Sequence, residues 1–123
     1  MIGKYLKKKY KFIPDHFKPN LPKSIELGDV AGISIDQQDN IYLFNRSKHP
    51  VIVLSQTGEF LRTWGQGVFK NPHGSHIGFD NNIYLTDNGD HTVRKFTLDG
   101  KLLLQIGIPN SSAGFMSGKP FCK

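Results

Sequence analysis

Two side chains in the sequence have the chemistry of a binding or metal site. His73 stands in the segment NPHG at 71–74, and Arg46 ends the segment FNR at 44–46. An imidazole nitrogen can bind a transition metal, and a guanidinium can hold a carboxylate through two parallel hydrogen bonds. Each residue also has a simpler interpretation, as a loop hydrogen-bonding group and as a solvated cation. The elements that position them decide between these interpretations.

The chain contains an internal repeat with a period of 42 residues. This displacement aligns NIYL at 40–43 with NIYL at 82–85, and it aligns Gly32, His49, Gly58 and Gly65 with Gly74, His91, Gly100 and Gly107. Each repeat predicts four short strands: 31–35, 41–45, 51–54 and 60–64, then 75–79, 83–86, 92–96 and 102–106. Segments rich in Asn, Asp and Gly separate them, as turns require. Four strands in a period of this length are typical of a β-propeller blade.

The sequence therefore predicts an all-β protein with two four-stranded antiparallel propeller blades, at 29–66 and 72–107. A basic N-terminal arm at 1–28 precedes the blades, and 108–123 is expected to be a linker toward a missing third blade. The alternative for eight short strands is a β-sandwich, which does not require identical residues at equal offsets. Propellers close with about four to eight blades. Two blades thus predict an incomplete propeller, whose open edges need the remaining blades or another copy of the chain.

The charge of the chain is unevenly placed. The net charge is +6, and residues 1–23 hold seven lysines and the single acid Asp15, whereas the remaining residues hold nine basic and nine acidic side chains. We interpret the arm, which has no arginine, as a solvated extension, and we do not expect nucleic acid as a partner. No apolar run approaches the roughly 20 residues that span a bilayer, so no membrane contact is predicted.

Two smaller observations concern the cell compartment. The arm interleaves its apolar residues with lysines and so lacks the continuous apolar core of a secretion signal. The default expectation is a cytoplasmic location. Cys122 is the one cysteine, so neither an intrachain disulfide nor a cysteine zinc cluster is predicted.

Blade topology places Arg46 and His73 on the same side of the disc. In a meander of four strands, the loop after the second strand (45–50 and 87–91) and the linker before the first strand (67–74) lie at the same end. The first strand lines the central channel, so His73, directly before the strand expected at 75–79, is predicted at the channel mouth. A cation and an imidazole that converge there form a candidate binding site.

The other histidines and the turn aspartates are interpreted as structural. His49 and His91 recur at equivalent repeat positions, each two residues before a valine that we expect to be buried. His76 lies three residues after His73, a spacing that puts strand side chains on opposite faces, so the two are not expected to chelate a metal together. Three aspartates fall in turns at the other end of the blades and need no catalytic role: Asp36, Asp80 and Asp99. The sequence has no nucleophile elbow, P-loop, dinucleotide fingerprint or HExxH motif.

Longer segments carry a family resemblance. The segment DNGDHTVRKFTLDGKLL at 87–103 and, more loosely, NRSKHPVIVLSQTGEFL at 45–61 resemble the NHL repeat. The segments at 28–46, 60–74 and 83–107, including the nonrepeating FNR and PHG, look like the first blades of the peptidyl-α-hydroxyglycine α-amidating lyase (peptidylamidoglycolate lyase) family. The resemblance covers about residues 28–121.

The resemblance implies a six-bladed propeller that splits a peptidyl-α-hydroxyglycine into a peptide amide and glyoxylate, a carbon–nitrogen lyase reaction. It implies a channel zinc held by three histidines, with a structural calcium deeper in the complete propeller. His73 would be one zinc ligand, and Arg46 would engage the carboxylate or hydroxyl region of the peptide or small-molecule substrate. The other ligands, a catalytic tyrosine and a second arginine lie on later blades of the family. The chain is thus expected to be an N-terminal part of a lyase-like propeller, inactive alone because one histidine cannot form a catalytic zinc site.

Two other functions stay open. A noncatalytic NHL-repeat propeller that binds protein or RNA is the main alternative, although the balanced charge of residues 24–123 does not favour RNA. A calcium-dependent sugar lactonase on a similar propeller is the weaker one, because its site needs carboxylate and asparagine ligands where this chain has His73 and Arg46.

Overall fold

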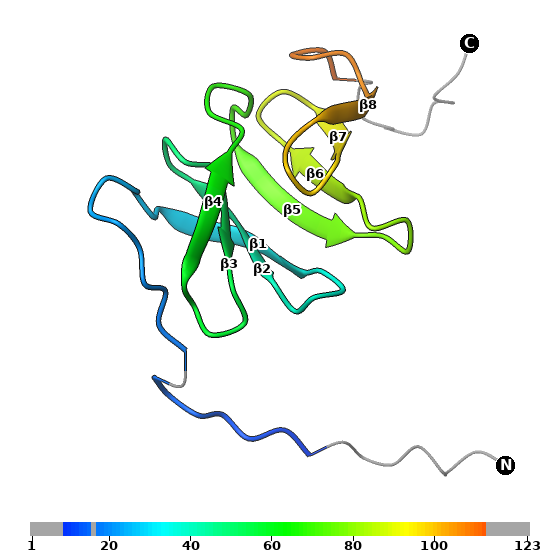
Figure 1. Ribbon diagram of the computed structural model, residues 1–123. Coiled ribbons are helices and arrows are strands. Elements are labelled where there is room, and N and C mark those ends of the chain that lie inside the picture. The colour runs from blue at the N-terminus through cyan, green and yellow to red at the C-terminus, as the bar shows by residue number, and fades with distance from the viewer. Residues whose placement is uncertain (1–8, 16, 113–123) are drawn as a thin grey trace, which may run out of the picture.

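The computed structural model describes residues 9–15 and 17–112, which form two four-stranded antiparallel sheets (Figure 1). The first sheet contains β1 (Asp29–Ile35), β2 (Ile41–Arg46), β3 (Val51–Leu54) and β4 (Phe60–Trp64). The second contains β5 (Pro72–Ile77), β6 (Ile83–Asp87), β7 (Thr92–Phe96) and β8 (Leu102–Ile106). Strands pair in chain order, so each sheet is a meander. Nowhere in the described ranges is there a helix that could cross a membrane.

The architecture confirms the predicted fold class of two propeller-like blades, and all eight predicted strands are present. The largest boundary error concerns β5, which runs over Pro72–Ile77 rather than 75–79. Phe79 therefore lies in the turn that follows β5, where it is fully exposed. β1 also begins earlier than predicted, at Asp29.

Glycine turns close the last hairpin of each sheet. Gly58 and Gly100 have φ angles of +93° and +98°, which glycine adopts without steric cost. The amide of Gly58 donates to the Ser55 carbonyl at 3.0 Å, and that of Gly100 donates to the Thr97 carbonyl at 3.1 Å. The repeat therefore reproduces one turn conformation, and with it one strand register, in both sheets.

A hydrophobic core lies between the two sheets. Its buried residues are Tyr42, Phe44, Val51, Val53 and Trp64 from the first sheet and Ile83, Leu85 and Phe96 from the second. Phe69, in the linker between the sheets, stacks edge-on against Phe44 with ring centroids 4.8 Å apart and lies 5.9 Å from the ring of Phe96. Because both sheets and the linker supply this core, the two sheets form one packed unit.

The first strands of the two sheets approach each other closely. A Cβ atom at Gly32 would lie 2.9 Å from both the Cβ and the backbone nitrogen of Ser75, so glycine permits this approach of β1 to β5. Beside it, the hydroxyl groups of Ser34 and Ser75 are 2.5 Å apart. This contact places the inner strands side by side, as around a propeller axis (Figure 1).

Polar groups also join the two sheets. Arg62 donates from Nη2 to the Leu98 carbonyl at 2.9 Å, and the indole nitrogen of Trp64 donates to the same oxygen at 3.2 Å. Tyr42, which accepts from Arg62 at 2.9 Å, donates to Asp36 at 3.0 Å. Burial, together with the hydrogen bond to Asp36, raises the pKa of Tyr42 to about 12. Tyr42 thus remains a protonated donor at neutral pH.

Residues 20–28, which we call the strap, cover the outer face of the first sheet. Leu21 and Ile25 pack against the buried residues Leu43, Ile52 and Leu54 of that face. This finding corrects the interpretation of the N-terminal arm as a solvated extension, which is wrong for the strap. Leu21 and Ile25 are packed against the sheet, which the lysine-rich composition of the arm did not indicate.

Five hydrogen bonds fix the strap along the first sheet, one of which runs from the side-chain amide of Asn20 to the Glu59 carboxylate at 2.9 Å. The Asn20 amide donates to the Gly58 carbonyl at 2.8 Å, and the Ser47 hydroxyl donates to the Glu26 carbonyl at 2.9 Å. The Glu26 amide donates to Nδ1 of His49 at 3.0 Å, and the Gly28 amide donates to Oδ1 of Asn45 at 3.0 Å. The strap is therefore held at both ends by specific contacts as well as by burial.

Candidate functional site

Arg46 and the segment that carries His73 lie together at one end of the sheets. Arg46 is the last residue of β2, and its Nε donates to the carbonyl oxygen of Pro72 at 3.1 Å. Pro72 precedes His73 directly in β5. This hydrogen bond joins the end of β2, which carries Arg46, to the start of β5, which carries His73.

His73 occupies a β-bulge rather than the predicted loop. Pairing between β5 and β6 passes from Pro72 with Asp87 directly to Gly74 with Thr86, so His73 is the extra residue. Ala31 holds the same place in β1, where pairing with β2 skips it. A bulge redirects the side chain of its extra residue, and His73 is exposed with no hydrogen bond to its ring within the described residues.

A pocket adjoins Arg46. It has a volume of about 300 Å³ and is lined by Arg46, Ser47, Pro50, Phe69, Lys70 and Pro72. Two of these residues are cations and none is an acid, so the pocket favours an anionic group such as a carboxylate. Lys70 reaches away to Asn110, to whose Oδ1 it donates at 3.2 Å.

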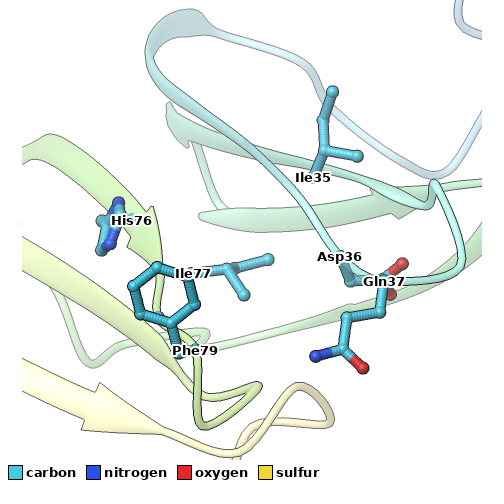
Figure 2. Close-up of a pocket in the computed structure, with 7 residues that line it drawn as sticks. Ile35, Asp36, Gln37, His76, Ile77 and Phe79 are labelled. Atoms are coloured by element: carbon cyan, nitrogen blue, oxygen red, sulfur yellow. The ribbon is translucent and has the colours of Figure 1, made fainter.

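A second pocket, of about 280 Å³, lies at the opposite end of the inner strands (Figure 2). Ile35, Asp36, Ile77 and Phe79 contribute to its largely apolar lining, and His76 stands at its edge. Figure 2 shows the side chain of Ile77 directed toward the turn of Asp36 and that of His76 directed away from it. His73 and His76 were not expected to chelate a metal together, because regular strand alternation puts residues three apart on opposite faces. The bulge at His73 interrupts that alternation.

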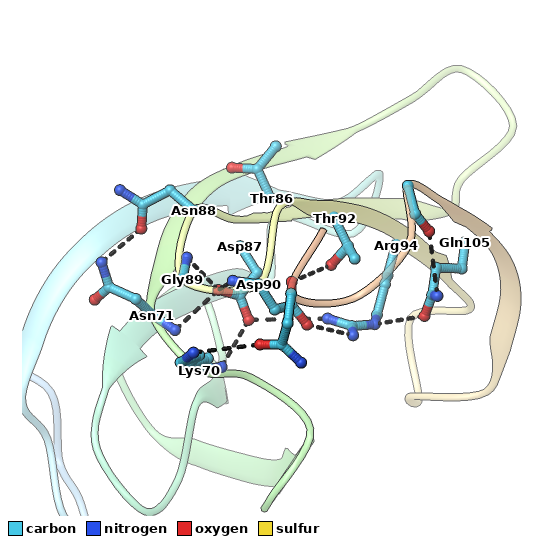
Figure 3. A network of polar contacts seen from close by, with 12 residues as sticks. Lys70, Asn71, Thr86, Asp87, Asn88, Gly89, Asp90, Thr92, Arg94 and Gln105 are labelled. Carbon is cyan, nitrogen blue, oxygen red and sulfur yellow. Dashed lines mark hydrogen bonds and ion pairs between the residues drawn. The ribbon is translucent and has the colours of Figure 1, made fainter. Parts of the chain in front are cut away.

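A buried carboxylate anchors the linker that leads to His73 (Figure 3). Asp87, at the end of β6, accepts backbone hydrogen bonds from Lys70 at 2.6 Å, Asn71 at 2.9 Å and Gly89 at 2.9 Å. This contact fixes the chain two residues before His73, so Asp87 positions the candidate site.

The equivalent anchor occurs in the first sheet. Asn45, at the repeat position of Asp87, accepts from the amide of Gly28, at the repeat position of Lys70. This pair was not predicted from the sequence. The sequence does contain one indication of this role: Asn45 and Asp87, which are 42 residues apart, both have a side-chain oxygen that can accept a hydrogen bond.

Arg94 compensates the charge of this anchor. Its Nη1 lies 3.8 Å from Asp87, its Nη2 lies 2.6 Å from Asp90, and its Nε donates to Gln105 at 3.0 Å. Burial acts to raise the pKa of the Asp90 carboxyl, but hydrogen bonds from Thr92 and Arg94 outweigh burial and hold that pKa below its usual value. The network therefore ties the linker, β6, β7 and β8 together with ionised groups.

Acid is expected to weaken this network. The free energy of unfolding should fall as the pH drops below about 4, the ordinary pKa of an aspartate, because the unfolded chain then binds a proton that folded Asp90 still excludes. Asp36 adds to the fall, since hydrogen bonds led by Asn40 lower its pKa against the effect of burial.

Urea unfolding at a series of pH values would measure the fall, which should be smaller in Asp90→Asn. Asn88→Ala, in the same loop, is the control and should show the same fall as the unchanged chain. If Asp90→Asn also showed the full fall, Asp90 would not be a source of the acid sensitivity.

The structure separates the two histidines that the repeat made equivalent. His49 has the predicted structural role, because its Nδ1 accepts from the strap. His91 is exposed with a φ angle of +65°, and the valine that follows it, Val93, is half-buried rather than buried as predicted. The buried residue is Thr92, which donates to Asp90 at 2.6 Å.

The described residues do not form a complete zinc site. They include no group of three or more His, Cys, Asp or Glu side chains that could hold a metal ion. His73 is free to supply one ligand, whereas a catalytic zinc needs about three from protein. Cys122 lies outside the described residues. The zinc and calcium predictions thus stay predictions.

Sequence comparisons agree with this architecture. No protein-family model matches the chain. It is 27% identical to peptidyl-alpha-hydroxyglycine alpha-amidating lyase 1 of Drosophila melanogaster in an alignment 128 positions long, which covers 81% of this chain and 23% of that protein. It is 31% identical over 100 residues to NHL repeat-containing protein 3 of Mus musculus, covering 72% of this chain and 28% of that protein. The chain resembles the amidating lyases and NHL-repeat proteins.

A third relative supports the lyase side of this resemblance. A probable peptidyl-alpha-hydroxyglycine alpha-amidating lyase of Caenorhabditis elegans is 23% identical over 108 residues, covering 68% of this chain and 31% of that protein. The chain thus spans between 23% and 31% of the length of these three relatives. The lyase-like and NHL-like resemblance predicted from the sequence is confirmed, at low identity over most of the chain.

Proposed function

We propose that the two sheets are blades of an amidating-lyase type propeller, in which Arg46 and His73 help to bind and cleave a peptidyl-α-hydroxyglycine. The observation that carries this proposal is the hydrogen bond from Arg46 to Pro72. It holds the arginine of one sheet against the residue before the exposed histidine of the next. The hydrogen bond thus brings Arg46 and the segment of His73, which come from adjacent blades, together at one end of the sheets.

The chemistry of Arg46 suits the substrate carboxylate. Its Nε is used by the Pro72 carbonyl, and no described hydrogen bond uses its two Nη groups. Arg46 is exposed at a pocket that has Lys70 as a second cation. A carboxylate that enters this pocket would meet a guanidinium whose position is already fixed, which reduces the entropy lost on binding.

His73 would contribute one ligand to a metal whose other ligands come from beyond the described residues. The described residues do not complete such a site, so we assign no reaction step to a metal. For the same reason, the chain alone is expected to release no glyoxylate from a peptidyl-α-hydroxyglycine. The peptide substrate, the zinc and the lyase reaction are all parts of the proposal, supported by the similarity to the lyases.

A chimera tests the proposal. Residues 29–107 would replace the matched segment of the Drosophila lyase, and glyoxylate release and bound zinc would be measured. The chimera is expected to be active, and His73→Ala should reduce bound zinc and lower activity by at least about 10–100-fold, the loss usual when a hydrogen-bonding partner of a metal ligand is removed.

His76→Ala is the matched control, because His76 is an exposed histidine of the same strand. It should leave zinc and activity unchanged. A folded, active chimera in which His73→Ala changes neither quantity would reject the site assignment. A folded chimera without activity would favour a noncatalytic NHL-repeat module.

A further inference from the structure

The second sheet has an outer face that no described residue covers. Ile83 and Leu85 of β6 point into the core between the sheets, so Tyr84 and Thr86 point outward, because strand side chains alternate. Strand pairing extends the outer face to Lys95 and Val93 of β7 and to Leu104 and Ile106 of β8. On the other side of β6 it extends the face to Gly74 and His76 of β5. Leu104 and Ile106 are 51% and 58% exposed. This surface is called the outer face of the second sheet below.

The repeat shows what kind of surface this is. Its members Gly74, Tyr84, Val93 and Ile106 lie 42 residues after Gly32, Tyr42, Val51 and Trp64. Those four residues belong to the face of the first sheet that packs against the second sheet. The uncovered face is therefore equivalent, position by position, to a face that already accepts a sheet.

The repeat also shows which surface would fit it. The first sheet is packed by Ile83, Leu85 and Phe96 of the second sheet. Their repeat equivalents are Ile41, Leu43 and Leu54, which form the outer face of the first sheet under the strap. One end of the two-sheet unit is thus complementary to its other end.

We propose that the outer face of the second sheet binds the outer face of the first sheet of another copy of the chain, and that the strap competes for this contact. The contact continues the packing between the two sheets within one chain. It joins different surfaces head to tail, as in a heterologous interface. The strap acts as the capping element that a stacked repeat needs at its end.

The charge of Lys95 on the outer face does not oppose the contact. Lys95 forms an ion pair with Asp80 at 2.6 Å, and its Nζ lies 5.3 Å from the centre of the Tyr84 ring. Its charge is already paired beside the apolar residues Leu104 and Ile106. The contact would therefore bury no isolated charge.

Release of the strap tests the proposal. The double variant Leu21→Asp, Ile25→Asp should expose the outer face of the first sheet. Sedimentation equilibrium is expected to show a single-chain mass for the original chain and masses of two or more chains for the variant. Circular dichroism would show that the sheets remain folded.

A blocked variant makes the test specific. Adding Ile106→Asp to the strap-release variant should restore the single-chain mass. Leu102→Asp is the matched control, because Leu102 lies on the same strand with similar exposure but pairs with Phe96, which faces the core. With Leu102→Asp, the larger masses should persist.

Mixing identifies the head-to-tail geometry. The strap-release chain that carries Ile106→Asp has an open first sheet and a blocked second sheet, whereas the original chain has the reverse. Their mixture should form a two-chain complex and nothing larger. A single-chain mass for the folded strap-release variant, equal loss of association with Ile106→Asp and Leu102→Asp, or growth of the mixture beyond two chains would overturn the proposal.

If the variant Leu21→Asp, Ile25→Asp precipitates, Leu21→Ala with Ile25→Ala is used for the mass measurements. The precipitation is also informative. If adding Ile106→Asp to the precipitating variant keeps it in solution, the contact is supported; if the triple variant still precipitates, the contact is rejected.

Discussion

The Asp87→Ala variant is expected to lose about 3–5 kcal/mol of unfolding free energy, the usual cost of removing one partner of a buried ion pair. Asp87 is 2% exposed. Its carboxylate accepts the amides of Lys70, Asn71 and Gly89 and lies 3.8 Å from Arg94. The substitution therefore leaves backbone donors without acceptors and a buried guanidinium with one carboxylate instead of two.

Urea unfolding followed by circular dichroism would measure the loss for Asp87→Ala. Asp29→Ala is the matched control, since it removes an exposed carboxylate at the start of β1. It should change the unfolding free energy by less than about 0.5 kcal/mol. Asp87→Asn should fall between the two, because one oxygen can still accept while the new amide meets a backbone donor. Equal stability of Asp87→Ala and Asp29→Ala would show that the linker is held in another way.

Phe96→Ala is expected to lower the unfolding free energy by about 3–5 kcal/mol, as for other buried phenylalanines. Phe96 is 3% exposed in the core between the sheets. Its ring lies 5.1 Å from that of Trp64 and 5.9 Å from that of Phe69. The cavity left by the substitution would face both sheets and the linker, so one cooperative unfolding transition should shift as a whole.

Phe79→Ala makes the same chemical change at a fully exposed site in the turn after β5. Its unfolding midpoint in urea should match that of the unchanged chain. If Phe96→Ala instead produced two separate transitions, the sheets would be independent units and the shared core would not control their stability.

The repeat made the strands predictable. Its recurring segments and its turns rich in Asn, Asp and Gly are local properties, and they predicted all eight strands, which the structure pairs in chain order. The error at β5 has a local cause as well. Pro72 and Gly74 indicated a loop, but a bulge accommodates both residues within the strand by leaving His73 unpaired.

The candidate site was predictable to a lesser degree. Meander topology predicted that Arg46 and the segment of His73 share one end of the blades, and the hydrogen bond from Arg46 to Pro72 agrees with this. The anchor at Asp87 was missed, because the residue type alone does not distinguish a buried aspartate that accepts backbone hydrogen bonds from an exposed aspartate in a turn. Its role depends on backbone amides from the preceding linker, which only the folded chain brings to it.

By itself, the sequence determined the two repeats, their strand order and the end of the blades at which the candidate residues lie, because these depend on periodicity and turn chemistry along the chain. The tertiary structure alone decided that His73 is a bulge residue, that Asp87 holds its linker and that the strap covers the first sheet. These three features arise from contacts between segments far apart in the chain. Such contacts are selected by burial and by hydrogen-bond satisfaction, which a local pattern does not encode.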